Sequence, residues 1–296
     1  MDRLYQTTMA GEPWMHRCPA CGLCAISPIP KSLGQVYDDA YTAASGADRK
    51  NRLLAPDYFR KIARFLPGGS FRFLEVGGAY GWLAELVRDR CKADVLLLEP
   101  GQTAVRMANA RGLTAVAGFV EAYQPDLRFD VVCAAHVIEH VDDLESFLAA
   151  CHRVIVPGGL LILLTPNARA WKLSQFGRAW AWAVPDQHTY FLSREGATRL
   201  LERSGFDMVA IREATPAFAH YPFFLTRWLA ERSAKSSVIE AAPAPQVAVA
   251  VPDRKFPWRR WLVRPLVVAE FVLLRIFDFL HPSEGGDELL VVARRR

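Results

Sequence analysis

Residues 71–82 read FRFLEVGGAYGW, and this stretch decides the fold class. It begins with a short apolar run and turns at three glycines, Gly77, Gly78 and Gly81. The residues that follow, GWLAELVRDR, carry apolar side chains at the spacing of a helix. A buried strand that turns sharply into a helix is the first half of a βαβ unit, so the stretch predicts a parallel sheet covered by helices.

The rest of the chain repeats this alternation. We expect strands at 71–76, 93–99, 113–118, 129–135, 160–166, 207–214 and 287–294. Helical patterns lie between them, at 81–90, 101–112, 142–155 and after Ser193, whose hydroxyl suits a helix cap. Short buried strands separated by helices predict an α/β fold, a doubly wound, Rossmann-like and mainly parallel sheet.

Composition limits the class of protein. Hydrophobic residues make up 51% of the 296 residues and charged residues 23%, as in ordinary folded proteins. The formal charge is +5 and no long basic stripe is present, so we expect no nucleic-acid partner. The N-terminus lacks the apolar region of a secretory signal, and three of the six cysteines lie in or beside apolar runs. We therefore expect a cytoplasmic protein without a disulfide framework.

Four segments are expected. They are a cysteine-containing segment at 1–45, a core at 46–215, an insertion at 216–285 and a closing strand at 286–296. Within the long insertion, 234–257 is typical of a linker and 265–280 of an amphipathic helix. Charged residues interrupt that helix, so it is unsuited to span a membrane. It either contacts a membrane surface through nearby arginines or packs as a lid, and the sequence leaves both open.

The glycine turn is typical of a nucleotide-type ligand site. Glycine lets the backbone approach a ligand where a Cβ would collide, and Glu99 ends the second strand, where an acid can bind both hydroxyls of a ribose. The G-x-G-x-x-G spacing that a nicotinamide cofactor favours is absent, because Ala79 takes the third position. The alternative is a plain tight turn followed by an exposed acid.

Four stretches, in the same order along the chain, resemble motifs of the class I S-adenosylmethionine-dependent methyltransferases, in particular the ubiquinone-O-methyltransferase-like group of small-molecule enzymes. The similar stretches are FLEVGGAYGWL, VLLLEP, FDVVCAAHVIEHVDDLESFLAACHRVIVPGGLLILLTPN and HTYFLSREGATRLLERSGF. The resemblance covers residues 71–214 and the closing strand. It implies an S-adenosylmethionine cofactor and an antiparallel last strand.

The resemblance also implies roles for individual residues. The cofactor-binding set is Glu75, Gly77, Gly78, Ala79, Gly81, Glu99, Phe119, Ala134, Ala135 and His136. Within it, Glu75 and the glycines line the methionine half, Glu99 holds the ribose, and the backbone at 134–136 faces the sulfonium. Two departures from the family pattern are Ala79 in place of a glycine and the lack of an acid after the third strand. Phe119 stacks on the adenine instead, or Glu121 replaces the acid.

The string HVIEH, residues 136–140, permits several interpretations. It matches an inverted zinc-peptidase motif, but it follows a strand directly and so is expected to form a loop or a single turn. Glu139 and His140 then either hold that loop or bind zinc or magnesium together with His136. His136 is also the first candidate for a catalytic base, with His188 second and Tyr190 a further pocket residue.

The cluster HRCPACGLC resembles the second half of a zinc ribbon. Cys18 and Cys21 form one Cys-x-x-Cys knuckle, whereas a structural zinc usually takes two. Cys24 and His16 can complete four ligands only by crowding one short turn. The alternative is a metal-free hook.

These motifs predict a methyltransferase that acts on a small-molecule acceptor. The tryptophan-rich stretch after residue 166 indicates a hydrophobic, aromatic or lipid-linked acceptor, with transfer to oxygen expected before nitrogen or carbon. The alternative is a cofactor-binding partner protein that has lost catalysis, which Ala79 and the missing adenine acid suggest.

Overall fold

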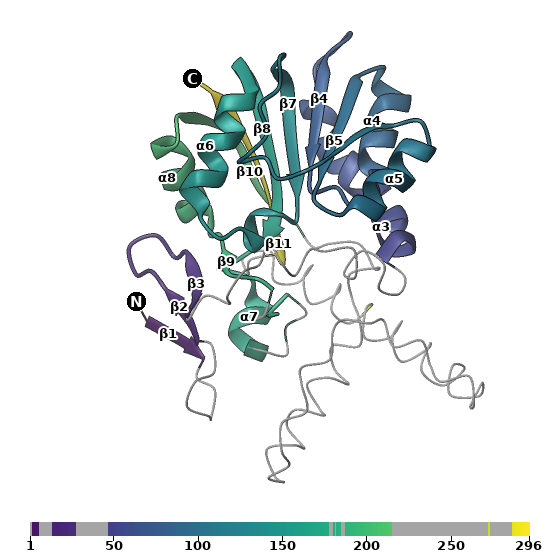
Figure 1. Ribbon diagram of the computed structural model, residues 1–296. Helices are drawn as coiled ribbons and strands as arrows, with labels where there is room; N and C mark the ends of the chain where they lie inside the picture. Colours follow the sequence, from purple (N-terminus) through teal and green to yellow (C-terminus); the bar gives the residue numbers. More distant parts are fainter. Residues whose placement is uncertain are drawn as a thin grey trace, which may run out of the picture.

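The computed structural model describes residues 2–5, 14–27, 47–177, 180, 182–184, 187–214, 272 and 286–296. Its centre is a seven-stranded sheet (Figure 1). In spatial order the strands are β10 (Phe206–Ala214), β11 (Glu288–Arg295), β8 (Ile155–Pro166), β7 (Phe129–Ala135), β4 (Arg72–Val76), β5 (Asp94–Glu99) and β6 (Thr114–Ala117). Strands β8, β7, β4, β5 and β6 pair in parallel, and β11 is antiparallel to both neighbours. The predicted α/β fold and its antiparallel last strand are confirmed.

Helices cover both faces of the sheet (Figure 1). One face carries α3 (Ala47–Ile62), α4 (Trp82–Cys91) and α5 (Gln102–Ala110), and the other carries α6 (Leu144–Val154) and α8 (Arg194–Arg203). Side chains along β7 alternate between the two cores: Val131 and Cys133 pack toward α3 and α4, and Val132 toward α6. Because side chains alternate between the two faces of a sheet, a strand that is buried on both faces has an unbroken run of apolar residues in its sequence.

Two elements differ from the sequence expectation. Strand β8 begins at Ile155, so Pro157 and the two following glycines lie inside the strand instead of forming a turn before it. Helix α3 was not predicted, because it contains Pro56 and is rich in charged residues. A proline inside a helix removes a backbone hydrogen bond and usually marks a helix end. The sequence around Pro56 therefore gives no clear sign of this sixteen-residue helix.

A second, small sheet joins the N-terminal segment to the core. Its strands are β1 (Asp2–Tyr5), β2 (Trp14–Arg17), β3 (Cys24–Ser27) and β9 (Tyr190–Phe191), and β3 pairs with β9. Met15 and Ile26 pack with Trp180 in a separate hydrophobic cluster beside the short helix α7 (Trp171–Phe176). Trp171 and Trp180, in the irregular stretch after β8, are both buried.

Part of the insertion prediction lies outside the described residues. This holds for the linker at 234–257 and, apart from Val272, for the helix at 265–280. Among the helices that the structure describes, none has the length and apolar character needed to cross a membrane.

Candidate active site

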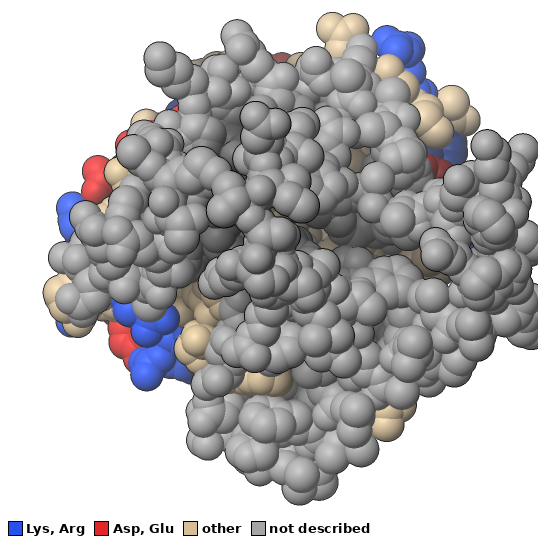
Figure 2. Space-filling model, turned by 90° about the horizontal axis from the view of Figure 1, so that it is seen from below, with Lys and Arg blue, Asp and Glu red and all other residues tan. Residues whose placement is uncertain are grey.

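The candidate site lies at the carboxyl ends of the parallel strands. The chain leaves β4 toward β5 and β6 on one side and later returns to β7 and β8 on the other, so the switch point lies between β4 and β7. Open α/β sheets bind ligands at such a point. Figure 2 views this edge; the charged side chains visible there among the described residues carry both signs and lie toward its margin.

The glycine turn after β4 is tightly packed. Gly77, Ala79 and Gly81 have φ angles of +64°, +49° and +73°, in the left-handed region that favours glycine. A Cβ on Gly77 would lie 2.6 Å from Cγ2 of Val137, in the loop after β7. The turn after β4 and the loop after β7 are therefore in direct contact, and glycine is required at position 77. Ala79 has a positive φ although it carries a Cβ, so its backbone is strained.

Glu75 is buried beneath this turn. A Cβ on Gly78 would lie 2.3 Å from Cδ of Glu75, so the carboxyl occupies the space that a side chain there would need. Its Oε2 accepts a hydrogen bond from the backbone N–H of Ala84 at 2.8 Å. Burial is the main cause that raises the pKa of Glu75 to about 8, although the Ala84 bond acts in the opposite direction. At neutral pH the carboxyl is therefore largely protonated.

Both oxygens of the Glu99 carboxyl, at the end of β5, accept backbone hydrogen bonds. Oε2 accepts from the N–H of Ala79 at 2.9 Å, and Oε1 accepts from the N–H of Gly101 at 3.0 Å. A carboxylate has about four acceptor positions, so two remain for hydroxyl donors. Burial raises its pKa. Phe119 follows β6, the neighbour of β5, and is 47% exposed, which leaves its ring open to a ligand.

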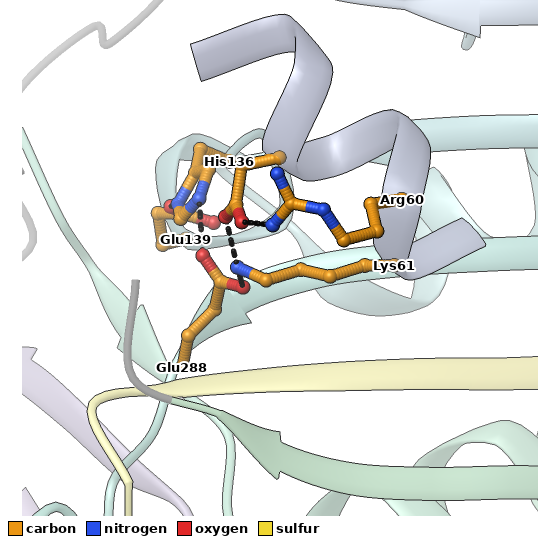
Figure 3. A network of polar contacts seen from close by, with 6 residues as sticks. Arg60, Lys61, His136, Glu139 and Glu288 are labelled. Carbon is orange, nitrogen blue, oxygen red and sulfur yellow. Dashed lines mark hydrogen bonds and ion pairs between the residues drawn. The ribbon is translucent and has the colours of Figure 1, made fainter. Parts of the chain in front are cut away.

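His136 directly follows β7 and lies between two carboxylates (Figure 3). Nδ1 lies 3.1 Å from Oε1 of Glu139, and Nε2 lies 3.1 Å from Oε2 of Glu288. Lys61 of α3 donates to the other oxygen of Glu288 at 2.6 Å. The ring also stacks on Trp182, with centroids 4.6 Å apart.

This arrangement sets the charge of His136. Burial alone would lower the pKa of the imidazole, but the hydrogen bonds and negative charges of Glu139 and Glu288 raise it to about 9. The ring is then a cation at neutral pH and donates from both nitrogens. It therefore has no lone pair with which to accept a proton from a substrate, so the geometry favours a positioning role over the base expected from the sequence.

The rest of the HVIEH string forms the single turn that was predicted, a 3-10 helix η2 (Ile138–His140). Ligand atoms of Glu139, His140 and His188 all lie within 4.8 Å of one another. Within the ranges that the structure describes, no other group of three or more His, Cys, Asp or Glu side chains gathers in this way. The third member is His188 and not His136, so the metal set expected from the sequence changes by one residue.

Both histidines of this cluster have a defined tautomer. Nδ1 of His140 lies 2.8 Å from the carbonyl of Gln187, and Nδ1 of His188 lies 2.7 Å from the carbonyl of Trp182. A carbonyl accepts only, so each Nδ1 carries the proton and each Nε2 keeps its lone pair. Burial lowers the pKa of His140, and it lowers that of His188 to about 3, so both rings are neutral.

Glu139 supplies the negative charge of the cluster. Burial opposes that charge, but the hydrogen bond from His136 lowers the pKa of the carboxyl to about 2. Its second oxygen accepts from the hydroxyl of Thr165 at 3.0 Å. One carboxylate and two imidazole lone pairs, each held by a further hydrogen bond, form a donor set that fits a divalent cation.

The remaining predicted residues lie around these two clusters. Ala134 and Ala135 end β7 beside the turn, as expected. The hydroxyl of Tyr190 donates to the carbonyl of Asp142 at 3.2 Å. Sequence reasoning missed Lys61 and Glu288. The only sequence signal was the pair of acids, Asp287 and Glu288, directly before the apolar run Leu289–Ala293.

Comparison with known proteins gives a consistent family. A family described as a methyltransferase domain matches residues 47–211. A ubiquinone biosynthesis O-methyltransferase of Rhodopseudomonas palustris is 36% identical over 107 residues, covering 34% of this chain and 41% of that protein. A protein of Mycolicibacterium smegmatis, named as a probable S-adenosylmethionine-dependent methyltransferase, is 31% identical over 226 residues. That match covers 72% of this chain and 76% of the relative.

Solved structures agree on the fold. A SAM-dependent methyltransferase of Thermotoga maritima superimposes with a TM-score of 0.51 at 17% identity, covering 83% of this chain and 91% of that one. A second, from Archaeoglobus fulgidus, gives 0.52 at 18% identity, covering 82% and 94%. At these identities the likeness concerns the fold alone.

A first prediction concerns Ala79. Ala79→Gly should raise the free energy of unfolding by about 1 kcal/mol, because glycine adopts the left-handed conformation without the steric cost that a Cβ brings. Ala108→Gly, in the interior of α5, is the control and should lower it by at least about 0.5 kcal/mol. Chemical denaturation measures the free energy of unfolding of both variants. A lower value for Ala79→Gly than for the wild type would show that the backbone at Ala79 is not strained.

A second prediction concerns Glu75 and pH. Because its folded-state pKa of about 8 lies above the ordinary value of 4.5, its contribution to stability is complete below pH 4.5 and disappears as the pH rises through 8. The stability of the wild type relative to Glu75→Gln should therefore fall by up to about 5 kcal/mol over this window. Denaturation at a series of pH values tests this, and a difference that does not vary with pH would refute it.

A third prediction concerns Glu288. Glu288→Gln removes a buried charge that faces both His136 and Lys61, and should cost about 3 kcal/mol of unfolding free energy. Glu145→Gln removes one side of an exposed pair with Arg203 and should change stability by less than about 1 kcal/mol. Equal effects of the two substitutions would show that the Glu288 network contributes nothing beyond a surface pair.

Proposed function

This chain belongs to the S-adenosylmethionine-dependent methyltransferase family, and we propose that it methylates a hydroxyl of a small aromatic acceptor with the help of a divalent cation. The enzyme class follows from the family. The acceptor and the cation are the proposal, and the observation that carries them is the cluster of Glu139, His140 and His188 at the carboxyl end of β7. This is the edge at which the family's cofactor residues also gather.

The cofactor residues fit S-adenosylmethionine. When bound, this cofactor supplies an electrophilic methyl group on a positively charged sulfur. Glu99 keeps acceptor positions for two ribose hydroxyls, and the turn at Gly77 and Gly78 has no room for a side chain. Ala79 directs its N–H toward Glu99, so this departure from the glycine pattern retains a contact with the ribose acid.

The donor set favours zinc or manganese over magnesium. Two imidazole nitrogens and one carboxylate suit borderline metals, whereas magnesium prefers oxygen ligands alone. Three protein ligands leave coordination positions open, as in catalytic and not structural metal sites. Lewis acidity at an acceptor hydroxyl is the chemistry that a cation held there would supply. Within the chain, His136 and Thr165 hold Glu139 in place for this purpose.

The relatives indicate the kind of acceptor. Several are named ubiquinone biosynthesis O-methyltransferases, although the match to the Rhodopseudomonas protein spans 41% of its length. An aromatic hydroxyl acceptor agrees with the ring of Trp182, which stacks on His136 beside the cation cluster. The main work of the enzyme is then alignment of acceptor oxygen, methyl carbon and sulfur, which in general supplies ~7–11 kcal/mol of a barrier.

The peptidase alternative does not fit this geometry. In that class the two histidines project from one face of a continuous helix, whereas here His136 follows a strand and His140 ends a 3-10 turn. His136 is also bound to two carboxylates and does not join the cation cluster.

The test is a pair of variants in chelator-dialysed protein. His140→Ala and His188→Ala should each weaken zinc or manganese binding by more than the ~10–100-fold that loss of a supporting residue costs, and should abolish cation-stimulated methylation of a catechol probe. Binding of S-adenosylmethionine, measured by calorimetry, should be retained in both. His152→Ala is the matched control, because His152 lies on α6 against Phe206, away from this cluster.

The outcomes separate the two parts of the proposal. Methylation of the catechol that is equal with and without the chelator would refute the cation while leaving the acceptor class. Failure of every hydroxyl acceptor, with cofactor binding intact, would refute O-methylation of an aromatic acceptor.

A further inference from the structure

The turn between β2 and β3 forms a compact cysteine knuckle. It has the sequence CPACGLC, residues 18–24. The N–H of Cys18 donates to the carbonyl of Leu23, and the N–H of Gly22 donates to the carbonyl of Cys18, both at 2.8 Å. Gly22 has a φ of +71°, which closes the turn. The two cysteines of the Cys-x-x-Cys unit are thus held on one tight loop.

The knuckle is suited to bind a metal through thiolates. The backbone N–H groups of Cys21 and Ala20 donate to the sulfur of Cys18, so the turn itself orients this sulfur. Thiolates are the form of cysteine that binds metal ions. Pro19 and Ala20 are exposed, and Cys18 and Cys21 are only partly buried, so the two sulfurs lie near the surface.

The third cysteine of the motif belongs to the core. Cys24 is fully buried among Met15 and Trp180, and its thiol contacts the carbonyl of Gly22 at 3.6 Å. Cys24 is therefore unavailable as a ligand beside the other two.

The knuckle provides two ligands where zinc requires four. His16 was the other residue expected to complete the set, but its ligand atoms do not form a compact group with those of Cys18 and Cys21. Of the described residues, no further His, Cys, Asp or Glu joins Cys18 and Cys21 in a compact group of ligand atoms. A structural zinc site is closed and tetrahedral, so the two missing ligands must come from elsewhere.

The knuckle is rigidly presented at the side of the molecule. Strand β3 pairs with β9, Arg17 donates to the carbonyl of Ala168 at 2.9 Å, and the hydroxyl of Ser193 donates to the carbonyl of Cys21. In Figure 1 the hairpin of β2 and β3 stands beside the sheet, below α8. Because these contacts already hold the loop in place, the loop loses little further conformational entropy when a metal binds.

We propose that Cys18 and Cys21 form half of a zinc site, which the same two cysteines of a second copy of this chain complete. A second copy is the partner that we infer, because the other four cysteines of this chain lie in β3, α4, β7 and α6, whereas a second copy supplies an identical pair of thiolates. A two-fold axis through the metal then relates the pairs, as in most homodimers. The resulting tetrahedral site has four sulfur ligands, a set that selects zinc among common divalent ions. This inference does not depend on the acceptor or on the cation cluster at Glu139.

Cobalt distinguishes this site from the other donor set. Chelator-treated full-length His188→Ala protein, in which the cation cluster lacks one ligand, is kept reduced with a non-thiol reductant and titrated with cobalt and then with zinc. Cobalt bound to thiolates gives an intense ultraviolet charge-transfer absorption, which nitrogen and oxygen ligands do not produce. We expect this absorption to saturate at one cobalt per two chains and to disappear when zinc replaces cobalt. Light scattering should show the molar mass doubling at the same ratio.

Variants test the assignment of ligands. Cys18→Ser and Cys21→Ser should each abolish the absorption and the metal-dependent dimer, while thermal melting shows that they remain folded. Cys91→Ser, a partly buried cysteine at the end of α4, is the control and should behave as the wild type. Saturation at one cobalt per monomeric chain would refute the shared site, as would the absence of a thiolate band. A zinc-dependent dimer that persists in both variants would also refute it.

Discussion

Two buried carboxylates on either side of one imidazole are the interaction on which this site depends. Glu139, Glu288 and His136 come from a 3-10 turn, the last strand and the end of β7, and both carboxylates are fully buried. Removal of charges from water costs several kcal/mol for each ion, so such a group persists only when every partner is in place. Lys61 supplies the fourth charge and thereby connects α3 to the same point.

This requirement also specifies the sheet. Glu288 lies opposite Pro166 in the antiparallel pairing of β11 with β8. Because side chains alternate along a strand, a slip of one residue would turn Glu288 to the other face and leave His136 and Lys61 facing apolar surface. The buried ion pairs therefore fix the register of a strand whose apolar residues, such as Leu289 and Val291, tolerate either face far better.

The sequence predicted the parallel core well because burial on both faces leaves a direct pattern. Strand β7 was expected at 129–135 and occupies Phe129–Ala135, and the HVIEH string forms the expected turn. The polar partners could not be predicted in the same way. Lys61 and Glu288 are 227 positions apart, and His188 joins Glu139 across a loop, so no periodicity records these contacts. Hydrophobic patterns encode which face is buried, but not which polar groups meet.

The two donor sets of this chain differ in ways that assign them different metal chemistry. Glu139 and His188 are buried and His140 is partly buried. Each is oriented by a further hydrogen bond, and three ligands leave coordination positions open. Cys18 and Cys21 are near the surface, soft and identical, and can be closed only by another pair. Ligand type and coordination number distinguish sites more reliably than affinity does, because most N, O and S sites rank divalent metals in the same order. Strand β3 pairs with β9, and Thr189, next to His188, donates its N–H to the carbonyl of Glu139. A short β-pairing therefore connects the surface knuckle to the buried cluster.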